Sequence, residues 1–289
     1  MTLQKKATLV ASSTATLLAI FKLVLGIASG SVALLASAVD SVLDMLISIF
    51  NYYAINKSEK PADKEFNYGH GKIEALASVI EGTIIAVSGL FLIYQAIKKY
   101  ITGEVSSYIG ISLFVMVISF IATYLLVKYL ENVADKTDNM VIKADALHYK
   151  TDLYSNGAVL VSLGLVYFTH IELIDIIVGL GIAFYIIYSA YELIEEGVLV
   201  LLDRAIDEDI TTQIKDIIAK NEFVKDYHFF KTREAGNQYF VDVHLVFTKA
   251  TLLIDAHNAS DEIEEEIEKL EDKKEWIFSI HLDPYDDSI

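Results

Sequence analysis

Six apolar stretches, each long enough to cross the hydrocarbon core of a bilayer, fill most of the first two thirds of this 289-residue chain. A spanning helix needs about 20 predominantly apolar residues, and it hydrogen-bonds its backbone internally because the bilayer core offers no water. The pattern therefore predicts an α-helical membrane protein with six transmembrane helices. The predicted spans are 7–28, 32–55, 73–98, 107–130, 146–169 and 173–196.

Composition points to a second, different part of the chain. The sequence is 54% hydrophobic yet has a net charge of −17, and most of the acidic excess follows Asp203. That combination is typical of an apolar membrane part joined to an acidic soluble part. An acidic surface argues against a nucleic-acid partner. Because cysteine is absent, any metal site must be built from His, Asp and Glu.

The first span imitates a cleavable signal peptide, since Lys5 and Lys6 precede an apolar run that ends near a small-residue motif. However, Lys22 interrupts the run, and it is longer than the usual apolar region of about 7–15 residues. We therefore expect this segment to remain as a span in the lipid bilayer.

Lysines are concentrated on one side of the predicted membrane domain, in and beside the connections that follow the second and fourth spans. The opposite side has little beyond Lys98 and Lys99. The positive-inside rule then predicts a multi-pass protein with both termini in the cytoplasm. The lysines on the cytoplasmic side are Lys57, Lys60, Lys64, Lys72, Lys136 and Lys143.

The segment 207–289 has the alternating helix and strand patterns of a small α+β domain. Helical periodicity in ITTQIKDIIAKN and DAHNASDEIEEEIEKLE alternates with the strand patterns YHFFKTRE, QYFVDVHLVF and WIFSIHLDP. The order αββαβ predicts a ferredoxin-like sheet with two helices on one face. We expect a transmembrane domain at 1–206 and a cytoplasmic domain at 207–289, whose modest core would gain from self-association.

Two pairs of ionisable residues interrupt the predicted spans: Asp40 and Asp44 in the second, His148 and Asp152 in the fifth. Each such group costs about 2.5–3.5 kcal/mol at membrane depth. A spacing of four places each pair on one helix face. Four O and N ligands suit tetrahedral Zn²⁺, and Fe²⁺ or Mn²⁺ would tolerate them. The alternatives are interhelical hydrogen bonds or a proton relay. Asp145, nearer the interface, is expected to be solvated or capping.

These pairs and other segments resemble the cation diffusion facilitator family, more narrowly its bacterial ferrous-iron and zinc efflux branch. The resemblance spans almost the whole chain. It implies a homodimer in the bacterial cytoplasmic (inner) membrane that exchanges Zn²⁺, Fe²⁺ or Cd²⁺ for protons at Asp40, Asp44, His148 and Asp152. The segments that carry it are DSVLD, ADALHYKTD, PADKEFNYGHGKIEALA, LLDRA, VDVHL, DAHNASDEIE and HLDP.

The same resemblance implies further sites. Asp63 and His70 correspond to a second metal site, weakened because Phe66 stands where many relatives have His; the alternative is a plain loop. Lys72 and Asp203 correspond to a charge interlock between protomers, or are an ordinary juxtamembrane lysine and helix-end aspartate. The cytoplasmic domain would dimerise and bind a regulatory metal ion at its interface. The residues of that site are His228, His244, His257, His281 and Asp283.

Charge suggests a mechanism for transport rather than enzymatic catalysis. Three carboxylates and a neutral imidazole suit a divalent ion, but three unpaired anions in low dielectric do not suit an empty site. Protons should therefore replace the departing metal, and an imidazole exchanges protons near neutral pH. A metal-gated ion channel and a non-transporting membrane metal sensor remain the alternatives, although a tight four-ligand site disfavours a fast conduit.

Overall fold

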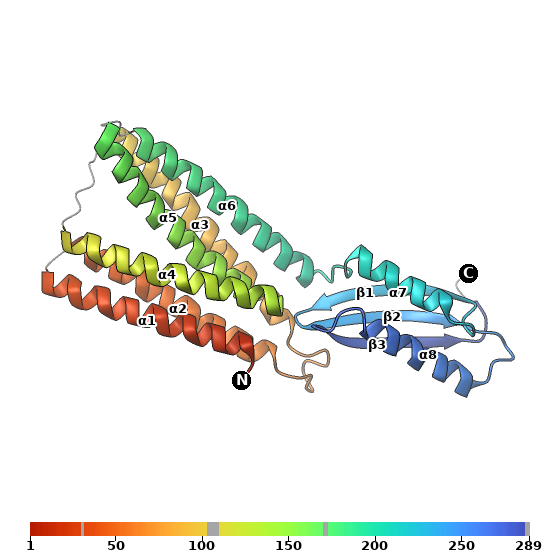
Figure 1. Cartoon of the computed structure of the whole chain (residues 1–289). Coiled ribbons are helices and arrows are strands. Elements are labelled where there is room, and N and C mark those ends of the chain that lie inside the picture. The colour runs from red at the N-terminus through yellow and green to blue at the C-terminus, as the bar shows by residue number, and fades with distance from the viewer. Residues whose placement is uncertain (30–31, 103–109, 170–172, 287–289) are drawn as a thin grey trace. The chain divides into compact units, whose positions relative to one another are not determined.

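The computed structural model describes residues 1–29, 32–102, 110–169 and 173–286, which form two compact units, Met1–Val198 and Leu199–Ile289 (Figure 1). Residues 30–31, 103–109 and 170–172, within the predicted outer connections, lie outside the described residues. The predicted domain boundary at 206–207 falls between the last helix of the first unit and the first helix of the second, and it stays a prediction.

The first unit consists of long helices at each of the six predicted positions, which confirms the expected class of fold. They are α1 (Leu3–Ser29), α2 (Val32–Ser58), α3 (Lys72–Thr102), α4 (Gly110–Thr137), α5 (Met140–Thr169) and α6 (Leu173–Leu201).

The outer surface of this unit is apolar. Among the described residues, α1, α3, α4 and α6 are long and apolar enough to cross a membrane, yet only 22–33% of the apolar window in each is buried. Leu17 and Ile27 of α1, for example, are each 68% exposed. So many outward-facing apolar side chains would be unfavourable in water, but they are stable in contact with the apolar lipid chains of a bilayer. The four ionisable residues predicted for the membrane site lie on the other two helices, α2 and α5.

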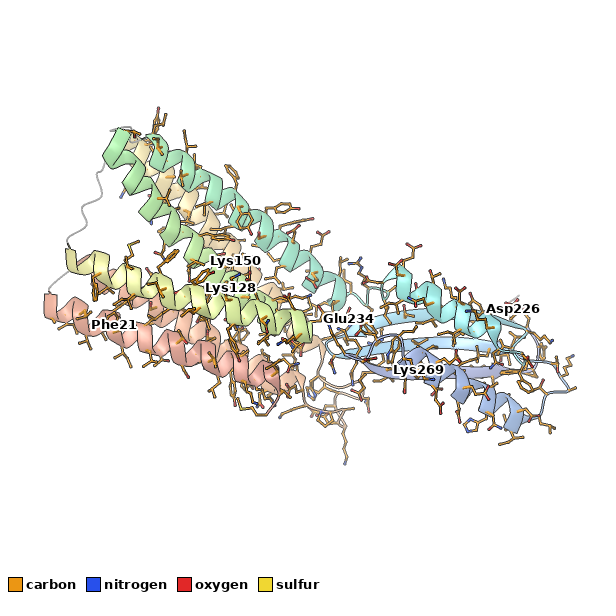
Figure 2. The ribbon with its side chains drawn as sticks, viewed as in Figure 1. Phe21, Lys128, Lys150, Asp226, Glu234 and Lys269 are labelled. Atoms are coloured by element: carbon orange, nitrogen blue, oxygen red, sulfur yellow. The ribbon has the colours of Figure 1, made fainter. Side chains whose placement is uncertain are left out.

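Small residues let the helices of this unit approach closely. Ala7, Ala11 and Ala15 form a buried stripe on α1 that joins a core with α2, α4 and α5. On α3, a Cβ added at Gly82 would come 2.8 Å from Ile194 of α6, so this crossing depends on the missing side chain. Polar groups also link these helices; for example, Lys150 Nζ of α5 donates to Glu131 Oε1 of α4 at 2.7 Å (Figure 2).

The second unit has the predicted αββαβ order. Its three-stranded sheet has the order β1-β2-β3, with β1 and β2 antiparallel and β2 and β3 parallel. The turn between β1 and β2 lies at Gly236, whose φ of 62° favours glycine. Both helices pack their apolar faces on one side of the sheet (Figure 1). The elements are α7 (Glu208–Lys220), β1 (Asp226–Ala235), β2 (Gln238–Val246), α8 (Leu253–Glu268) and β3 (Glu275–Asp283).

Candidate metal sites

Three of the four ionisable residues predicted for the membrane site lie together between α2 and α5. His148 Nε2 lies 3.4 Å from Asp44 Oδ1 and 3.9 Å from Asp152 Oδ2. One ligand atom from each of the three residues lies within 4.8 Å of the others. His148 is only 8% exposed, and its Nε2 has no hydrogen-bond partner within the described structure. The imidazole and two carboxylates thus present nitrogen and oxygen donors to one small volume.

The fourth predicted residue, Asp40, lies outside this group of three. It is on α2 one turn before Asp44, and it is exposed. Lys22 of α1 lies beside this region, since its Nζ donates to Ser41 Oγ at 2.8 Å. The lysine interacts electrostatically with Asp44, Asp152 and Asp40. An amine therefore lies close to the carboxylates of the predicted site.

Asp145 differs from the expectation of a solvated or capping residue. It is fully buried, and its Oδ1 accepts hydrogen bonds from Asn51 Nδ2 at 3.2 Å and Ser48 Oγ at 3.5 Å. The expectation was wrong because α5 begins earlier than its apolar run, so the side chain of Asp145 faces α2 rather than the interface. A spacing of three residues from His148 was the available signal that both share one side of the helix.

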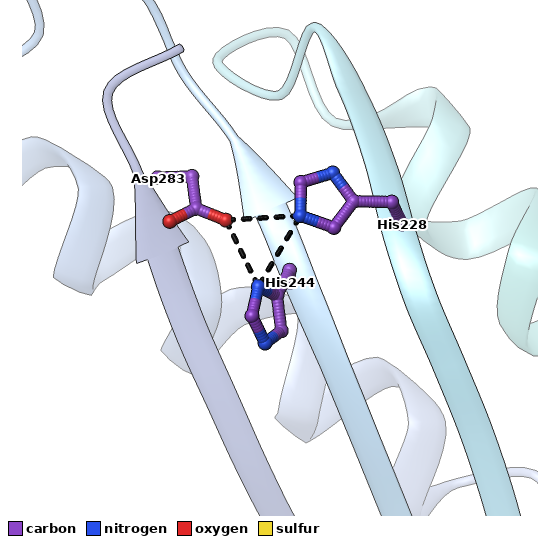
Figure 3. Close-up of side chains that lie close together, drawn as sticks. All are labelled: His228, His244 and Asp283. Carbon is purple, nitrogen blue, oxygen red and sulfur yellow. Dashed lines mark hydrogen bonds and ion pairs between the residues drawn. The ribbon is translucent and has the colours of Figure 1, made fainter. Parts of the chain in front are cut away.

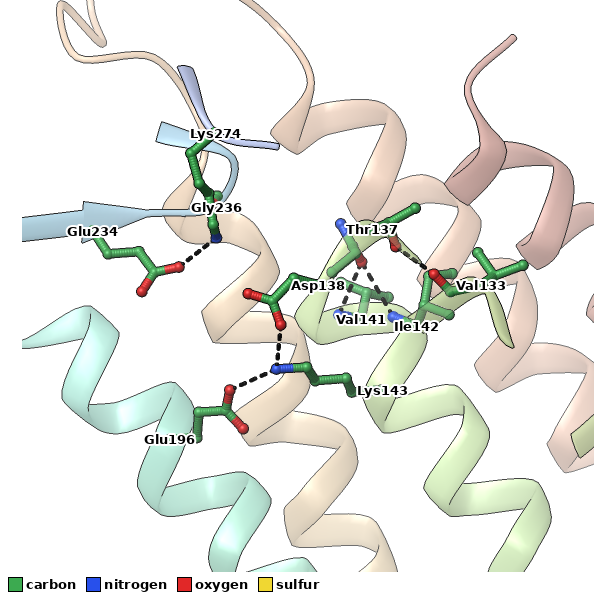
Figure 4. A network of polar contacts seen from close by, with 11 residues as sticks. Val133, Thr137, Asp138, Val141, Ile142, Lys143, Glu196, Glu234, Gly236 and Lys274 are labelled. Carbon is green, nitrogen blue, oxygen red and sulfur yellow. Dashed lines mark hydrogen bonds and ion pairs between the residues drawn. The ribbon is translucent and has the colours of Figure 1, made fainter. Parts of the chain in front are cut away.

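The start of α5 is held by polar contacts that orient this helix. Asn139 is the residue before α5, and its Oδ1 accepts the backbone N–H groups of Val141 and Ile142 at 3.1 Å each. Lys143 Nζ lies 2.8 Å from Asp138 Oδ1 and 2.9 Å from Glu196 Oε1 of α6 (Figure 4). Burial opposes the charge of Lys143, but these two carboxylates raise its pKa above the ordinary value.

In the second unit, strand register places three histidines in one row. His228 of β1 is opposite His244 of β2, which is opposite His281 of β3. Val243 and Leu245, which flank His244 on β2, belong to the core between the sheet and the helices. Because side chains alternate along a strand, His244 lies on the opposite face of the sheet, away from the helices. A β-bulge between His228 and Lys231 interrupts the ladder, and bulges commonly re-aim side chains beside functional sites.

Two of these histidines converge on one carboxylate (Figure 3). Asp283 Oδ2 lies 3.2 Å from His228 Nε2 and 3.0 Å from His244 Nδ1, and the two nitrogens are 3.2 Å apart. Asp283 is 4% exposed. His281 Nε2 lies 3.0 Å from the other oxygen, Oδ1, so the carboxylate faces ligands on both sides and could bridge two ions.

His257 is not part of this group within one protomer. It lies on α8, its side chain is 61% exposed, and its Nδ1 is 3.5 Å from Asp261 Oδ1. An additional carboxylate does reach the group, because Asp286 Oδ1 lies 3.3 Å from His228 Nδ1. Asp286 was not among the predicted ligands, although its position soon after Asp283 and the strand end was a usable signal.

The loop between α2 and α3 contains the weaker predicted pair. His70 Nε2 lies 3.6 Å from Asp63 Oδ2, and the ring of Phe66 packs on His70 with centroids 4.7 Å apart. Asp63 Oδ1 accepts the backbone N–H groups of Phe66 and Glu65 at 2.8 Å each. Those hydrogen bonds hold the pKa of Asp63 below its ordinary value. The pair offers two ligands, and Phe66 adds none.

The predicted charge interlock joins residues of different units, so the pairing of Lys72 with Asp203 stays a prediction. Within the second unit, Asp203 Oδ1 accepts a hydrogen bond from Arg233 at 3.2 Å.

A separate lysine holds the turn between β1 and β2. Lys274 Nζ of the second unit donates to Glu234 Oε1 at 2.6 Å and to the carbonyl of Gly236 at 3.1 Å (Figure 4).

Comparison with known proteins gives a consistent assignment along the chain. Residues 8–202 match the family profile described as the cation efflux transmembrane domain, and residues 206–285 match the cytoplasmic domain of cation efflux proteins. The chain belongs to the cation diffusion facilitator family. It is a multi-span membrane protein of a family that transports metal cations, and the matched cytoplasmic domain, a dimerisation domain, supports a homodimer.

Relatives in this family are similar over nearly their whole length. The cation-efflux pump FieF of Serratia proteamaculans is 36% identical over 263 residues, covering 91% of this chain and 87% of that protein. FieF of Citrobacter koseri is 35% identical over 282 residues, covering 98% and 93%. FieF of Escherichia coli (strain K12) is 34% identical over 282 residues, covering 98% of this chain and 93% of that protein. These similarities support efflux of metal cations as the activity of the family.

Proposed function

We propose that this protein exports divalent transition-metal cations, namely Zn²⁺, Fe²⁺ and Cd²⁺, from the cytoplasm in exchange for protons. The observation that carries the proposal is the convergence of Asp44, His148 and Asp152 between two membrane helices. An imidazole nitrogen beside carboxylate oxygens suits these ions better than Mg²⁺ or Ca²⁺. Asp40, one turn from Asp44 on α2, is the proposed fourth ligand and would complete a tetrahedral set.

Proton exchange follows from the charge of the site. A divalent ion neutralises most of the charge of Asp40, Asp44 and Asp152, whereas the empty site would leave three anions in a region of low dielectric. Lys22 offsets part of that charge but not all of it. Protons that bind as the metal leaves would neutralise the remainder, with His148 as the natural acceptor near neutral pH. Metal and protons then move in opposite directions.

The cytoplasmic domain is proposed to bind the same metals as regulatory ions and to hold two protomers together. His228, His244 and Asp283 supply three ligand atoms to one point, and His281 approaches the other side of the carboxylate. His257 lies on α8, outside this group of three, and is proposed to bind across the dimer interface. A bound ion would also neutralise the acidic surfaces that otherwise repel each other.

Two smaller assignments complete the proposal. Asp63 and His70 are a weak second metal site, because two ligands hold Zn²⁺ less well than three or four. Lys72 and Asp203 are proposed to form the charge interlock between protomers at the junction of membrane and cytoplasm.

The proposed location is the cytoplasmic (inner) membrane of a bacterium, with both termini in the cytoplasm. The positive-inside rule supports this orientation. The relatives named above are bacterial proteins.

Reconstituted vesicles test the proposal directly. With an internal metal-sensitive dye and a pH indicator, imposed pH gradients should drive Zn²⁺, Fe²⁺ or Cd²⁺ uphill, with proton movement in the opposite direction. Metal flux without proton movement would identify a metal-gated channel instead, and metal binding without flux would identify a sensor. Asp44→Ala vesicles control for leakage.

A further inference from the structure

A second cluster of polar side chains is buried between α2, α3 and α5, apart from the group at Asp44. Asn51, Glu81 and Asp145 are 0%, 1% and 0% exposed. Asn51 Nδ2 donates to Glu81 Oε2 at 3.0 Å and to Asp145 Oδ1 at 3.2 Å. A single side-chain amide therefore bridges two carboxyl groups that come from two other helices.

Each member of this cluster keeps one oxygen without a hydrogen-bond partner. These atoms are Asn51 Oδ1, Glu81 Oε1 and Asp145 Oδ2, and all three are buried. Within the described part of the chain, neither carboxyl group forms an ion pair with a lysine or arginine. Two anions with unsatisfied oxygens are strongly disfavoured in a buried site. The cluster therefore calls for a positive charge or a donor that its side chains do not themselves supply.

One proton on Glu81 answers both requirements. A carboxylic acid and a primary amide are complementary, since the amide N–H donates to one acid oxygen while the acid O–H donates to the amide oxygen. The first bond is present, from Asn51 Nδ2 to Glu81 Oε2. A proton on Glu81 Oε1 supplies the donor that Asn51 Oδ1 lacks. Asp145 is the better remaining anion, because it also accepts a hydrogen bond from Ser48.

The groups that face Glu81 make its charge sensitive to the neighbouring metal site. On α5 these groups are Asp145 and His148, which both interact with it electrostatically. On α2, Asp44 interacts with Asp145, and on α5 the hydroxyl of Tyr149 is hydrogen-bonded to Ser48. α6 packs against α3 beside Gly82 through apolar residues, while Glu192 and Glu195 of α6 are exposed.

We propose that Glu81, Asn51 and Asp145 form a proton-binding site separate from the metal site, and that its proton leaves when metal occupies Asp44, His148 and Asp152. The inference rests on the proposed function, because it adds a proton carrier to the same exchange. Asn51 lies seven residues after Asp44 on α2, which is about 10 Å of helix rise. Across that distance in a low-dielectric interior, a divalent cation favours ionised Glu81. The carboxylic acid becomes a carboxylate, and its proton is released to solvent.

The test counts protons released for each metal ion bound. Isothermal titration of Zn²⁺ into the full-length protein, in buffers of different ionisation enthalpy, measures this ratio. Glu81→Gln keeps the size and hydrogen bonds of a protonated glutamate but cannot ionise. It should bind the same number of Zn²⁺ ions and release about one proton fewer for each ion bound at the membrane site. Glu192→Gln, an exposed residue of α6, is the matched control and should behave as wild type.

The outcomes separate this inference from the proposed function. An unchanged proton count in Glu81→Gln overturns the proton site alone, whereas a wild-type protein that moves no metal overturns the proposed function itself. Loss of one bound Zn²⁺ in Glu81→Gln would mean that the cluster holds metal rather than a proton. If the variant does not fold, infrared spectra of wild type decide: the band of a protonated carboxylic acid should weaken as Zn²⁺ is added, and an unchanged spectrum contradicts the inference.

Discussion

His148 Nε2 and Asp44 Oδ1 lie 3.4 Å apart, although α5 and α2 carry them from distant parts of the sequence. Asp152 approaches the same nitrogen from the next turn of α5. This contact is too long for a good hydrogen bond, and it leaves space for an ion that binds both side chains. If these residues form the proposed transport site, the separation of the two helices at this level would set the space available to the metal.

Asp44→Ala and Asp152→Ala should each abolish proton-coupled metal transport, while the protein still inserts and dimerises. Each change removes one charged ligand, and the ligands left bind a divalent ion far less well. Metal uptake into vesicles and size-exclusion chromatography measure the two properties. Asp135→Ala, an exposed aspartate of α4, is the control. Half of the wild-type flux in either site variant would contradict the assignment.

His148→Asp should broaden metal preference toward Mn²⁺, because an all-oxygen site suits a harder ion. The variant should also have a different pH profile, since a carboxyl group with a lower ordinary pKa replaces the imidazole. Transport rates for Zn²⁺, Cd²⁺ and Mn²⁺ over a range of pH measure both effects. An unchanged preference together with an unchanged profile would show that His148 is not a ligand.

The isolated segment 207–289 should be a dimer whose melting temperature rises with Zn²⁺. Binding to the folded state alone stabilises it by about 2.7 kcal/mol at a hundredfold excess of metal over the dissociation constant. His244→Ala combined with His281→Ala should remove this rise, and chelation should reverse it in wild type. Asp242→Ala, an exposed acid on the same strand as His244, is the control. A persistent rise in the double variant would leave the domain as a dimerisation module only.

Asn139→Ala should lower the stability of the membrane domain by about 1 kcal/mol, because it removes the N-cap of α5. The two backbone N–H groups bound by Asn139 would lose their acceptor in a buried position. Thermal unfolding in detergent measures the loss. Asn139→Asp retains a capping oxygen and should recover most of it, whereas equal destabilisation by both changes would argue against capping.

Local pattern was sufficient to predict the elements and to single out the three residues that the structure brings together between α2 and α5. Apolar length predicted the six helices, and a spacing of four predicted that Asp40 with Asp44, and His148 with Asp152, share helix faces. The alternation in 226–283 predicted the strands. These features depend on helix and strand geometry within a single segment, so they are readable without knowledge of neighbouring segments.

Contacts between segments were decided only by the tertiary structure. The rotation of α2 places Asp44 at His148 and leaves Asp40 outside the trio, and the packing of α2, α3 and α5 buries Asp145 against Asn51 and Glu81. Spacing along one helix cannot reveal which side chain a different helix presents.

In the cytoplasmic site, too, the sequence predicted the residue types, and the tertiary structure decided which of them meet. Histidines were recognisable in the sequence, but the strand register aligns His228, His244 and His281, while His257 lies on α8 and outside the group at Asp283. Register is set by pairing over the whole sheet and by the bulge after His228, and a shift of one residue would turn His244 to the other face. The types of ligand were therefore determined locally, and their convergence was determined by long-range packing.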